Sequence, residues 1–272
     1  MVSQTPKAEP KKDLGLRLAS AAVLIPVALF VVFQGGAWLA TACGLFAAIM
    51  AYEWVRMTAS PSMKIFVTLA ILPFIPAILG EQLWAVWTLF ACVFLASLIH
   101  PNGEKRGAEA FGLLYVCGMS LALYVLREGP WDGVAAALIV MGIVWGSDSA
   151  AYFTGRTLGG PLLHPDSPSK TWSGAIGAVV FSSLCGALAA YLTDGHLFAW
   201  VTMGAIISIL AQVGDLMESS MKRSYGVKDS GGVMPGHGGL LDRVDGLGLV
   251  CAVIATLFLF VPLLTRALGL AG

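Results

Sequence analysis

Nine stretches of this 272-residue chain are apolar over lengths suited to crossing a membrane. A helix needs roughly 17 to 25 apolar residues to span about 30 Å of hydrocarbon. The stretches are continuously apolar and do not alternate, which favours helices over a β-barrel. We therefore predict an all-α integral membrane protein, a polytopic bundle of about nine transmembrane helices. The predicted spans are approximately 16–33, 37–53, 65–80, 83–99, 111–126, 134–153, 174–192, 197–213 and 247–265.

The composition excludes several other classes of protein. Hydrophobic residues make up 57% of the chain and charged residues 12%, with a formal net charge of zero. The charged share is about half that of an average soluble domain. A water-soluble enzyme, a disordered protein and a basic nucleic-acid binder are therefore excluded. The five cysteines lie in apolar stretches without a CxxC pair, so they are expected to be buried hydrophobic residues.

The distribution of basic residues predicts the orientation of the chain. With nine spans, fourteen of the sixteen Lys and Arg fall on one side, and only Arg127 and Arg266 fall on the other. Basic loops stay in the cytoplasm, so the N-terminus is predicted to be cytoplasmic and the C-terminus to lie across the membrane. Residues 1–13 are expected to form a disordered cytoplasmic tail. Residues 14–272 are expected to form one transmembrane catalytic domain, with its active site mainly in 145–246.

The first span could be mistaken for a cleaved signal peptide. Basic residues precede it, and Ala40-Thr41-Ala42 resembles a cleavage site. That tripeptide lies inside the next apolar stretch, however, beyond Gly35 and Gly36. We therefore expect the first span to be retained.

Charges concentrate in residues 215–245, which hold nine of the chain's 32 acidic and basic residues. Asp215 and Glu218 are three residues apart and share one helix face, and Asp242 and Asp245 repeat this spacing at the start of the last span. Two such pairs can converge on a hard cation, and few carboxylates with open positions suit Mg²⁺. N-terminal capping is the alternative for Asp242, but it does not explain all four carboxylates.

Basic and glycine residues in and near the same region predict phosphate binding. Arg makes bidentate contacts to phosphate, Lys supplies a point charge, and Gly permits close backbone approach with N–H groups facing an anion. His237 can be an acid, a base or a phosphate donor, or it can complete a tight turn. Carboxylates, Mg²⁺, bases and Gly turns together are what phosphoryl chemistry needs. The basic and glycine candidates are Lys170, Lys222, Arg223, Lys228, Arg243, Gly236, Gly238 and Gly239.

A second polar stretch interrupts the sixth span and continues into the loop that follows. Asp148 lies within that span, where a carboxylate is costly and is by default a functional candidate. The alternative is a hydrogen bond that packs one helix against another. The loop then contains Ser167-Pro168-Ser169-Lys170-Thr171-Trp172-Ser173-Gly174.

These motifs resemble the signature of the phosphatidate cytidylyltransferases, also called CDP-diacylglycerol synthases. The order and spacing match over 26 positions, and the segments around Asp148 and Lys170 are also similar to family motifs. Ser169 and Ser173 depart from the family, which usually has Lys and Glu there. The matching residues are Ser220-Met221-Lys222-Arg223, Lys228-Asp229, Pro235-Gly236-His237-Gly238-Gly239 and Asp242-Arg243-Val244-Asp245.

The resemblance implies that CTP and phosphatidate react to give CDP-diacylglycerol and pyrophosphate with Mg²⁺, and suggests a potassium ion nearby. It implies a multi-pass protein of the bacterial inner membrane, with its active site facing the cytoplasm, and it is compatible with a homodimer. On this reading Asp215, Asp242 and Asp245 hold the metal. The remaining implied roles are catalysis or phosphate binding for Lys222, Arg223, Lys228, Asp229, His237 and Arg243, and substrate binding for Asp148, Ser167, Lys170, Thr171, Ser220, Gly238 and Gly239.

Three other functions are compatible with parts of this pattern. An ion-coupled transporter would explain the intramembrane Asp148 and the Pro-broken helices. However, the charges cluster at one face and no inverted repeat is visible. A CTP-dependent polyprenol kinase would use the same nucleotide, but the His-Gly-Gly-x-x-Asp-Arg run argues against it. A structural scaffold would have no use for the polar cluster.

Overall fold

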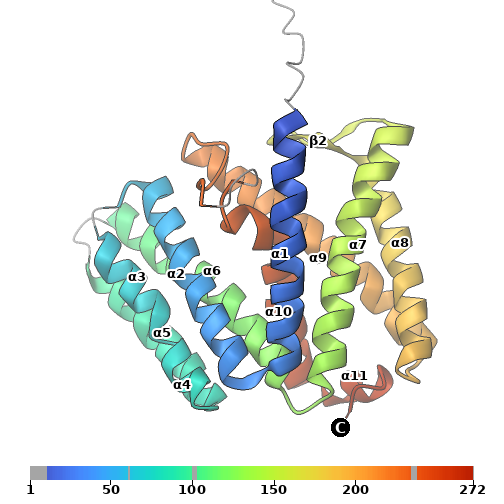
Figure 1. Ribbon diagram of the computed structural model, residues 1–272, viewed down its shortest axis with the longest axis horizontal. Helices are drawn as coiled ribbons and strands as arrows, with labels where there is room; N and C mark the ends of the chain where they lie inside the picture. The colour runs from blue at the N-terminus through green and yellow to red at the C-terminus, as the bar shows by residue number, and fades with distance from the viewer. Residues whose placement is uncertain (1–10, 61, 100–102, 234–237, 272) are drawn as a thin grey trace, which may run out of the picture.

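The computed structural model describes residues 11–60, 62–99, 103–233 and 238–271, which form a bundle of helices with one short β-hairpin (Figure 1). The helices before the hairpin are α1 (Lys11–Gln34), α2 (Gly36–Thr58), α3 (Met63–Ile71), α4 (Phe74–Ile78), α5 (Gln82–Ile99), α6 (Gly103–Glu128) and α7 (Gly133–Leu158). The hairpin and the helices after it are β1 (Leu162–His164), β2 (Ser167–Thr171), α8 (Trp172–Leu192), α9 (Leu197–Ser224), α10 (Leu241–Phe260) and α11 (Pro262–Ala267).

The predicted membrane class is confirmed. Within the described ranges, six helices are long and apolar enough to cross a membrane, namely α2, α6, α7, α8, α9 and α10. Three shorter apolar helical segments cover 22–34, 63–78 and 82–98. Every predicted span overlaps one of these nine segments, and the count of nine membrane crossings stays a prediction.

Prolines explain where two predicted spans differ from the helices observed. The span predicted over 65–80 is divided into α3 and α4 next to Pro73. The last span was predicted over 247–265, but α10 begins at Leu241 and ends at Phe260. Pro262 opens α11 instead, because proline has no amide hydrogen to continue the preceding helix but fits the first turn of a new one.

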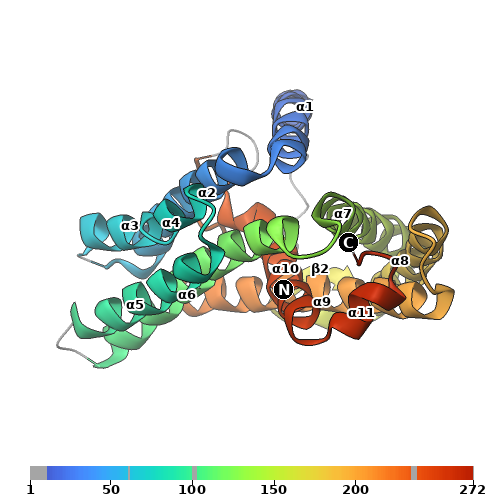
Figure 2. The same cartoon turned by 90° about the horizontal axis from the view of Figure 1, so that it is seen from below.

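Two groups of helices meet on α10. Helices α2 to α6 pack together on one side, α7 to α9 pack together on the other, and α10 contacts both α6 and α9 (Figure 2). Helix α1 stands at the edge and touches α2 and α7. The hairpin β1–β2 is antiparallel, with Leu162 opposite Thr171 and His164 opposite Ser167.

The outer surface of the bundle is apolar, as expected for contact with lipid. Large side chains such as Trp84, Trp87 and Phe94 on α5 are at least 60% exposed. The interior holds both large residues, such as Trp54 and Trp200, and glycines at close helix crossings. A Cβ on Gly204 of α9 would lie 2.2 Å from the Ser182 carbonyl oxygen of α8, so only glycine permits this approach.

One end of the bundle gathers the polar groups, and we call it the polar end. It contains the hairpin, the C-terminal ends of α7 and α9, and the first turns of α8 and α10 (Figure 1). The N-terminal end of α1 also points this way. The C-terminal segment lies at the opposite end, where Ala271 forms a β-bridge with Trp131.

Candidate active site

The polar end is built on a close crossing of α9 and α10. A Cβ on Gly214 would lie 2.7 Å from the Asp245 carbonyl oxygen, and a Cβ on Gly246 would lie 2.8 Å from Asp215 Oδ1. The two glycines therefore let the helix backbones touch. As a result, the Asp215 carboxylate of α9 is placed directly against the first turns of α10.

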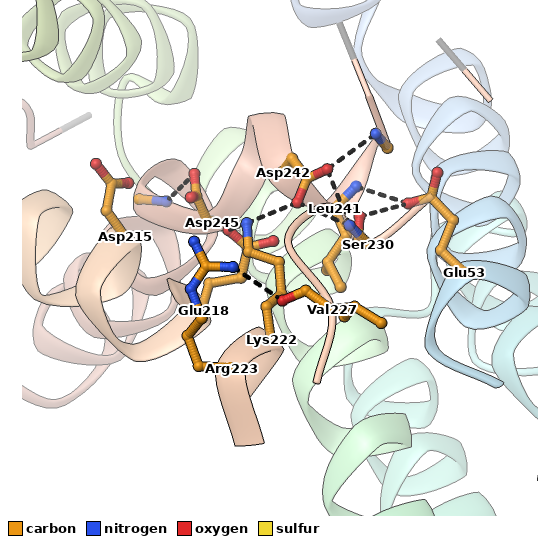
Figure 3. Close-up of polar contacts among 12 residues, drawn as sticks. Glu53, Asp215, Glu218, Lys222, Arg223, Val227, Ser230, Leu241, Asp242 and Asp245 are labelled. Carbon is orange, nitrogen blue, oxygen red and sulfur yellow. Dashed lines mark hydrogen bonds and ion pairs between the residues drawn. The ribbon is translucent and has the colours of Figure 1, made fainter. Parts of the chain in front are cut away.

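Three carboxylates converge at this crossing, and we call Asp215, Glu218 and Asp245 the crossing cluster (Figure 3). The Asp245 carboxyl group lies within hydrogen-bonding distance of both Asp215 and Glu218. Asp245 Oδ1 also accepts the Gly246 amide at 2.8 Å. Glu218 is 1% exposed, and its buried Oε1 has no hydrogen-bond partner among the residues that the structure describes. Adjacent acceptors of this kind require a proton or a cation between them.

Two lysines neutralise the outer oxygens of these carboxylates. Lys170 from β2 donates to Asp215 Oδ2 at 2.5 Å. Lys222, one turn after Glu218 on α9, donates to Glu218 Oε2 at 3.2 Å and to Asp242 Oδ1 at 2.7 Å. The predicted helix face running from Asp215 through Glu218 to Lys222 is thus confirmed as one continuous part of α9.

Asp242 links the crossing cluster to the loop that precedes α10. Besides Lys222, it accepts the Ser230 amide at 3.1 Å and the Gly239 amide at 2.9 Å. Gly239 precedes Leu240, the N-cap residue of α10, so this bond ties the entering loop to the first turn of the helix. Asp242 lies in that first turn, where a negative charge is favourable, but it is not the N-cap residue. The Gly239 amide, predicted to face a phosphate, is used by this carboxylate instead.

Glu53 of α2 was missed in the sequence and anchors the same loop from the other side. It is 1% exposed, and it accepts the Leu240 and Leu241 amides, each at 2.9 Å, and the Ser230 hydroxyl at 3.4 Å. We call Glu53 and these three donors the loop anchor; Figure 3 labels Glu53, Ser230 and Leu241. Glu53 could have been found from the sequence, because a carboxylate at the end of an apolar span is a functional candidate, as it was for Asp148.

The hairpin carries three predicted substrate residues, and the structure gives them different surroundings. Lys170 reaches the crossing cluster. The Thr171 hydroxyl accepts the Gly174 amide at 3.2 Å and so caps α8. Ser167 is buried at the start of β2. The adjacent Asp166, not predicted from the sequence, accepts the Ser220 hydroxyl at 2.7 Å and ties the hairpin to α9.

The remaining predicted cations lie on the exposed side of the polar end. Arg223 donates to the Val227 carbonyl oxygen at 3.1 Å. Lys228, Asp229 and Arg243 are also exposed. Gly238 adopts a φ of +84°, which favours glycine, and its Cβ position lies 3.0 Å from Asp242 Oδ2. His237 and Gly236 lie outside the described residues.

A cavity of about 520 Å³ extends from the polar end along apolar side chains of the edge helix α1 and its neighbours. This volume is in the range of small-molecule sites. Polar side chains line one part of it, and apolar side chains from α1, α2, α7 and α10 line the rest. The polar lining residues are Asp148, Asp215, Asp242, Arg243 and Asp245, and the apolar ones include Leu24, Ile25, Val31, Leu39, Phe46 and Leu247.

The carboxylates can be tested against the Mg²⁺ that the resemblance implies. Within the described ranges, no three or more His, Cys, Asp or Glu side chains are arranged so that they could hold a metal ion. Asp215 and Asp245 of the crossing cluster nevertheless line the cavity. Behind them, the buried Glu218 Oε1 has no donor within the described part of the chain. Mg²⁺ commonly takes only one or two carboxylates and completes its shell with water and substrate phosphates. The donor set fits that mode of binding.

A membrane-embedded helical bundle with lysine-paired carboxylates beside a part-polar, part-apolar cavity defines a class of protein that handles phosphorylated, membrane-borne substrates. Comparison with known proteins gives the family. The chain matches the model of the cytidylyltransferase family over residues 15–261, and it belongs to that family.

Named relatives cover nearly the whole chain. A Brucella suis protein called phosphatidate cytidylyltransferase is 36% identical over 259 residues, which are 91% of this chain and 93% of the relative. A Pseudomonas aeruginosa protein of the same name is 33% identical over 89% of this chain and 95% of its own length. A Staphylococcus aureus protein, also so named, is 30% identical over 90% and 98%. The resemblance inferred from the signature residues is therefore confirmed.

Proposed function

We propose that this protein transfers a cytidylyl group from CTP to phosphatidate and releases pyrophosphate, giving CDP-diacylglycerol. The observation that carries the proposal is a cavity with a polar part, lined by Asp215, Asp242 and Asp245, and a long apolar wall. Lys170 pairs with Asp215, and Lys222 pairs with Asp242. The names of the relatives support the same substrates. A nucleotide needs the polar part of such a cavity, and a lipid needs both parts.

The shape of the cavity supports a lipid acceptor. Apolar side chains of α1, α2 and α7 line its inner part, and Asp215, Arg243 and Asp245 line its polar part. A phosphatidate phosphate held near Arg243 would leave its acyl chains beside the apolar wall. A water-soluble acceptor would gain nothing from that wall.

The reaction requires charge neutralisation more than it requires a base. One oxygen of the phosphatidate phosphate forms a bond to the α-phosphorus of CTP, and the bond from that phosphorus to the bridging oxygen breaks. The electron pair leaves with pyrophosphate. A phosphate monoester has a second pKa of about 6, so the attacking oxygen is already ionised near neutral pH. Lys170 and Lys222 lie where they can offset the combined charge and align the two polyanions.

We also propose that Mg²⁺ binds beside the cavity at one or two of the carboxylates Asp215, Asp242 and Asp245, with water and substrate phosphates completing its shell. When bound, the ion would neutralise charge on the phosphates of CTP. The protein's own contribution is to hold these oxygens at the edge of the cavity, through Lys170, Lys222 and the backbone amides of Gly239 and Gly246. Activity that persists unchanged in EDTA would contradict this part of the proposal.

The site is proposed to face the cytoplasm of a bacterium, in an inner-membrane protein with nine crossings. The N-terminal end of α1 and the polar end lie on the same side, and the C-terminal segment lies on the other, which supports an odd number of crossings (Figure 1). The bias in Lys and Arg supports the cytoplasmic assignment. Alkaline phosphatase fused after Ala271 should be active, and a fluorescent protein fused there should be dark. The opposite pair of results would reverse the orientation.

The experiment that tests the function follows the label in CTP. Purified protein with Mg²⁺ and phosphatidate should transfer label from the α-phosphorus of CTP into lipid and release unlabelled pyrophosphate. Transfer of γ-phosphorus label to polyprenol would instead identify a lipid kinase. Ion flux into liposomes without CTP consumption would identify a transporter.

A further inference from the structure

We propose that Glu53 is a positioning residue for the active site, acting through the start of α10. This inference rests on the proposed function, because its main readout is turnover of CTP with phosphatidate. Glu53 accepts the backbone amides of Leu240 and Leu241, which lead directly into the first turns of α10. Those turns carry the predicted catalytic residues Asp242, Arg243 and Asp245.

The start of α10 lacks a capping side chain at its own N-cap position. Leu240 occupies that position and makes no side-chain cap hydrogen bond. The first amides of any helix have no partner within the helix and need acceptors from elsewhere. Glu53 Oε1 accepts the Leu240 amide and Oε2 accepts the Leu241 amide, each at 2.9 Å. A residue 188 positions away in the sequence thus caps α10 from a different helix.

The loop backbone lies so close to Glu53 that only glycine fits at two of its positions. A Cβ on Gly231 would lie 2.8 Å from Glu53 Oε1, and a Cβ on Gly239 would lie 2.8 Å from Oε2. The loop backbone therefore passes directly over the carboxylate at both of its ends. The Ser230 hydroxyl donates a hydrogen bond to Glu53, and the Ser230 backbone amide donates one to Asp242.

Glu53 and Asp242 consequently hold the same two stretches of backbone from opposite sides. Asp242 accepts amides of Ser230 and Gly239, and Glu53 accepts the amides of Leu240 and Leu241 together with the Ser230 hydroxyl. Asp242 also accepts a hydrogen bond from the Lys222 ammonium group. A shift of the start of α10 would therefore move the Asp242 carboxylate away from that lysine. Glu53 thereby sets the distance between the first turn of α10 and the side chains of α9.

A merely structural role and a positioning role differ in what they predict. A carboxylate that only stabilises the bundle would lower the unfolding temperature when replaced and leave kcat of the surviving folded protein unchanged. A positioning carboxylate would lower kcat in protein that remains folded. It would also release the Leu240 and Leu241 amides to hydrogen exchange.

The experiment compares Glu53→Gln and Glu53→Asp with wild-type protein in detergent. Gln keeps one acceptor oxygen but turns an NH₂ group toward the other amide. We expect kcat to fall roughly ten- to hundredfold, the factor for one charge-assisted hydrogen bond, with KM for CTP within about threefold of wild type. Glu53→Asp keeps both acceptor oxygens on a shorter side chain and should restore part of kcat. Exchange at Leu240 and Leu241 should rise in Glu53→Gln.

Two further variants keep the test decisive. Glu109→Gln alters another buried glutamate, 3% exposed on α6, which accepts the Ser60 hydroxyl. Gly231→Ala disturbs the anchor from the loop side if Glu53→Gln fails to fold, and it should reproduce the fall in kcat. Wild-type kcat and exchange in Glu53→Gln, or an equal fall of kcat in Glu109→Gln, would overturn the inference. Inactive wild-type protein would instead overturn the proposed function.

Discussion

The crossing cluster and the loop anchor each contain a glutamate that is 1% exposed at the same end of the bundle, yet the two are satisfied differently. Glu53 of the loop anchor accepts two backbone amides and a hydroxyl. Glu218 of the crossing cluster accepts Lys222 on one oxygen and lies beside Asp245, and its other oxygen has no hydrogen-bond partner in the described ranges.

Buried acids that hold the fold together differ from those available for a ligand in what already binds their oxygens. A carboxylate saturated by backbone donors has no capacity left for a substrate or cation. A carboxylate crowded against other carboxylates is costly for the fold and is retained where an external charge can complete it. Asp242 belongs to both regions, because it accepts loop amides and Lys222 together.

Asp245→Asn changes the crossing cluster and leaves the loop anchor intact, and it should have the largest effect on activity. We expect activity to fall about a thousandfold, the scale for losing a preorganised electrostatic group. The unfolding temperature should stay the same or rise, because the new amide can keep the Gly246 bond and donate to Glu218. Pyrophosphate release measures the activity, and thermal unfolding measures the unfolding temperature. A large drop in unfolding temperature would show that Asp245 belongs with the architectural acids.

Lys170→Gln tests whether the hairpin supplies charge to the crossing cluster. It removes the ammonium group that lies 2.5 Å from Asp215 and leaves the hairpin tied to α9 through Asp166 and Ser220. Activity should fall about a hundredfold, as for loss of a charged phosphate contact. Steady-state kinetics in CTP is the measurement. Kinetics equal to wild type would confine Lys170 to a structural ion pair.

Gly246→Ala disturbs the geometry of the crossing without changing its charge. The added methyl would lie 2.8 Å from Asp215 Oδ1 and 3.0 Å from the Ala211 carbonyl oxygen. Overpacking of this kind costs about 1–3 kcal/mol of unfolding free energy, and activity should fall about tenfold.

Gly118→Ala is the matched control for this substitution. Gly118 is also a helical glycine, and nothing lies within 4 Å of its Cβ position. It should gain about 0.5–1 kcal/mol from helix propensity. Equal unfolding free energies and equal activities of Gly246→Ala and Gly118→Ala would argue against a close crossing of α9 and α10.

Thr171→Val should have the smallest effect on turnover. The hydroxyl caps α8, so its removal should cost about 1 kcal/mol of unfolding free energy and leave kcat within about threefold. Thermal unfolding and steady-state kinetics measured on the same preparation check this. A large loss of kcat at unchanged stability would instead support the substrate contact predicted from the sequence.

The sequence predicted those parts of the molecule that depend on local patterns. Apolar runs predicted the helices, and spacing of three and four residues predicted the shared face of Asp215, Glu218 and Lys222 on α9. The Thr171 cap was also predictable, since a threonine directly precedes an apolar helix.

Contacts between distant segments could not be predicted in this way. Glu53 ends an apolar run without a motif, and its partners are 177 to 188 residues away. No local pattern says which loop will cover it. The Gly239 amide was likewise predicted to face a phosphate, whereas it donates to Asp242. This pairing depends on the conformation of the loop before α10, which no local pattern predicts.

The most direct test of the account is binding of Mn²⁺, a paramagnetic substitute for Mg²⁺, measured by electron paramagnetic resonance in the presence of CTP. Wild type, Asp245→Asn and Glu53→Gln should be compared as folded proteins. We predict that Asp245→Asn loses the bound signal and that Glu53→Gln retains it, because Asp245 lines the cavity whereas Glu53 is occupied by two backbone amides and a hydroxyl. Wild-type Mn²⁺ affinity in Asp245→Asn would contradict the account.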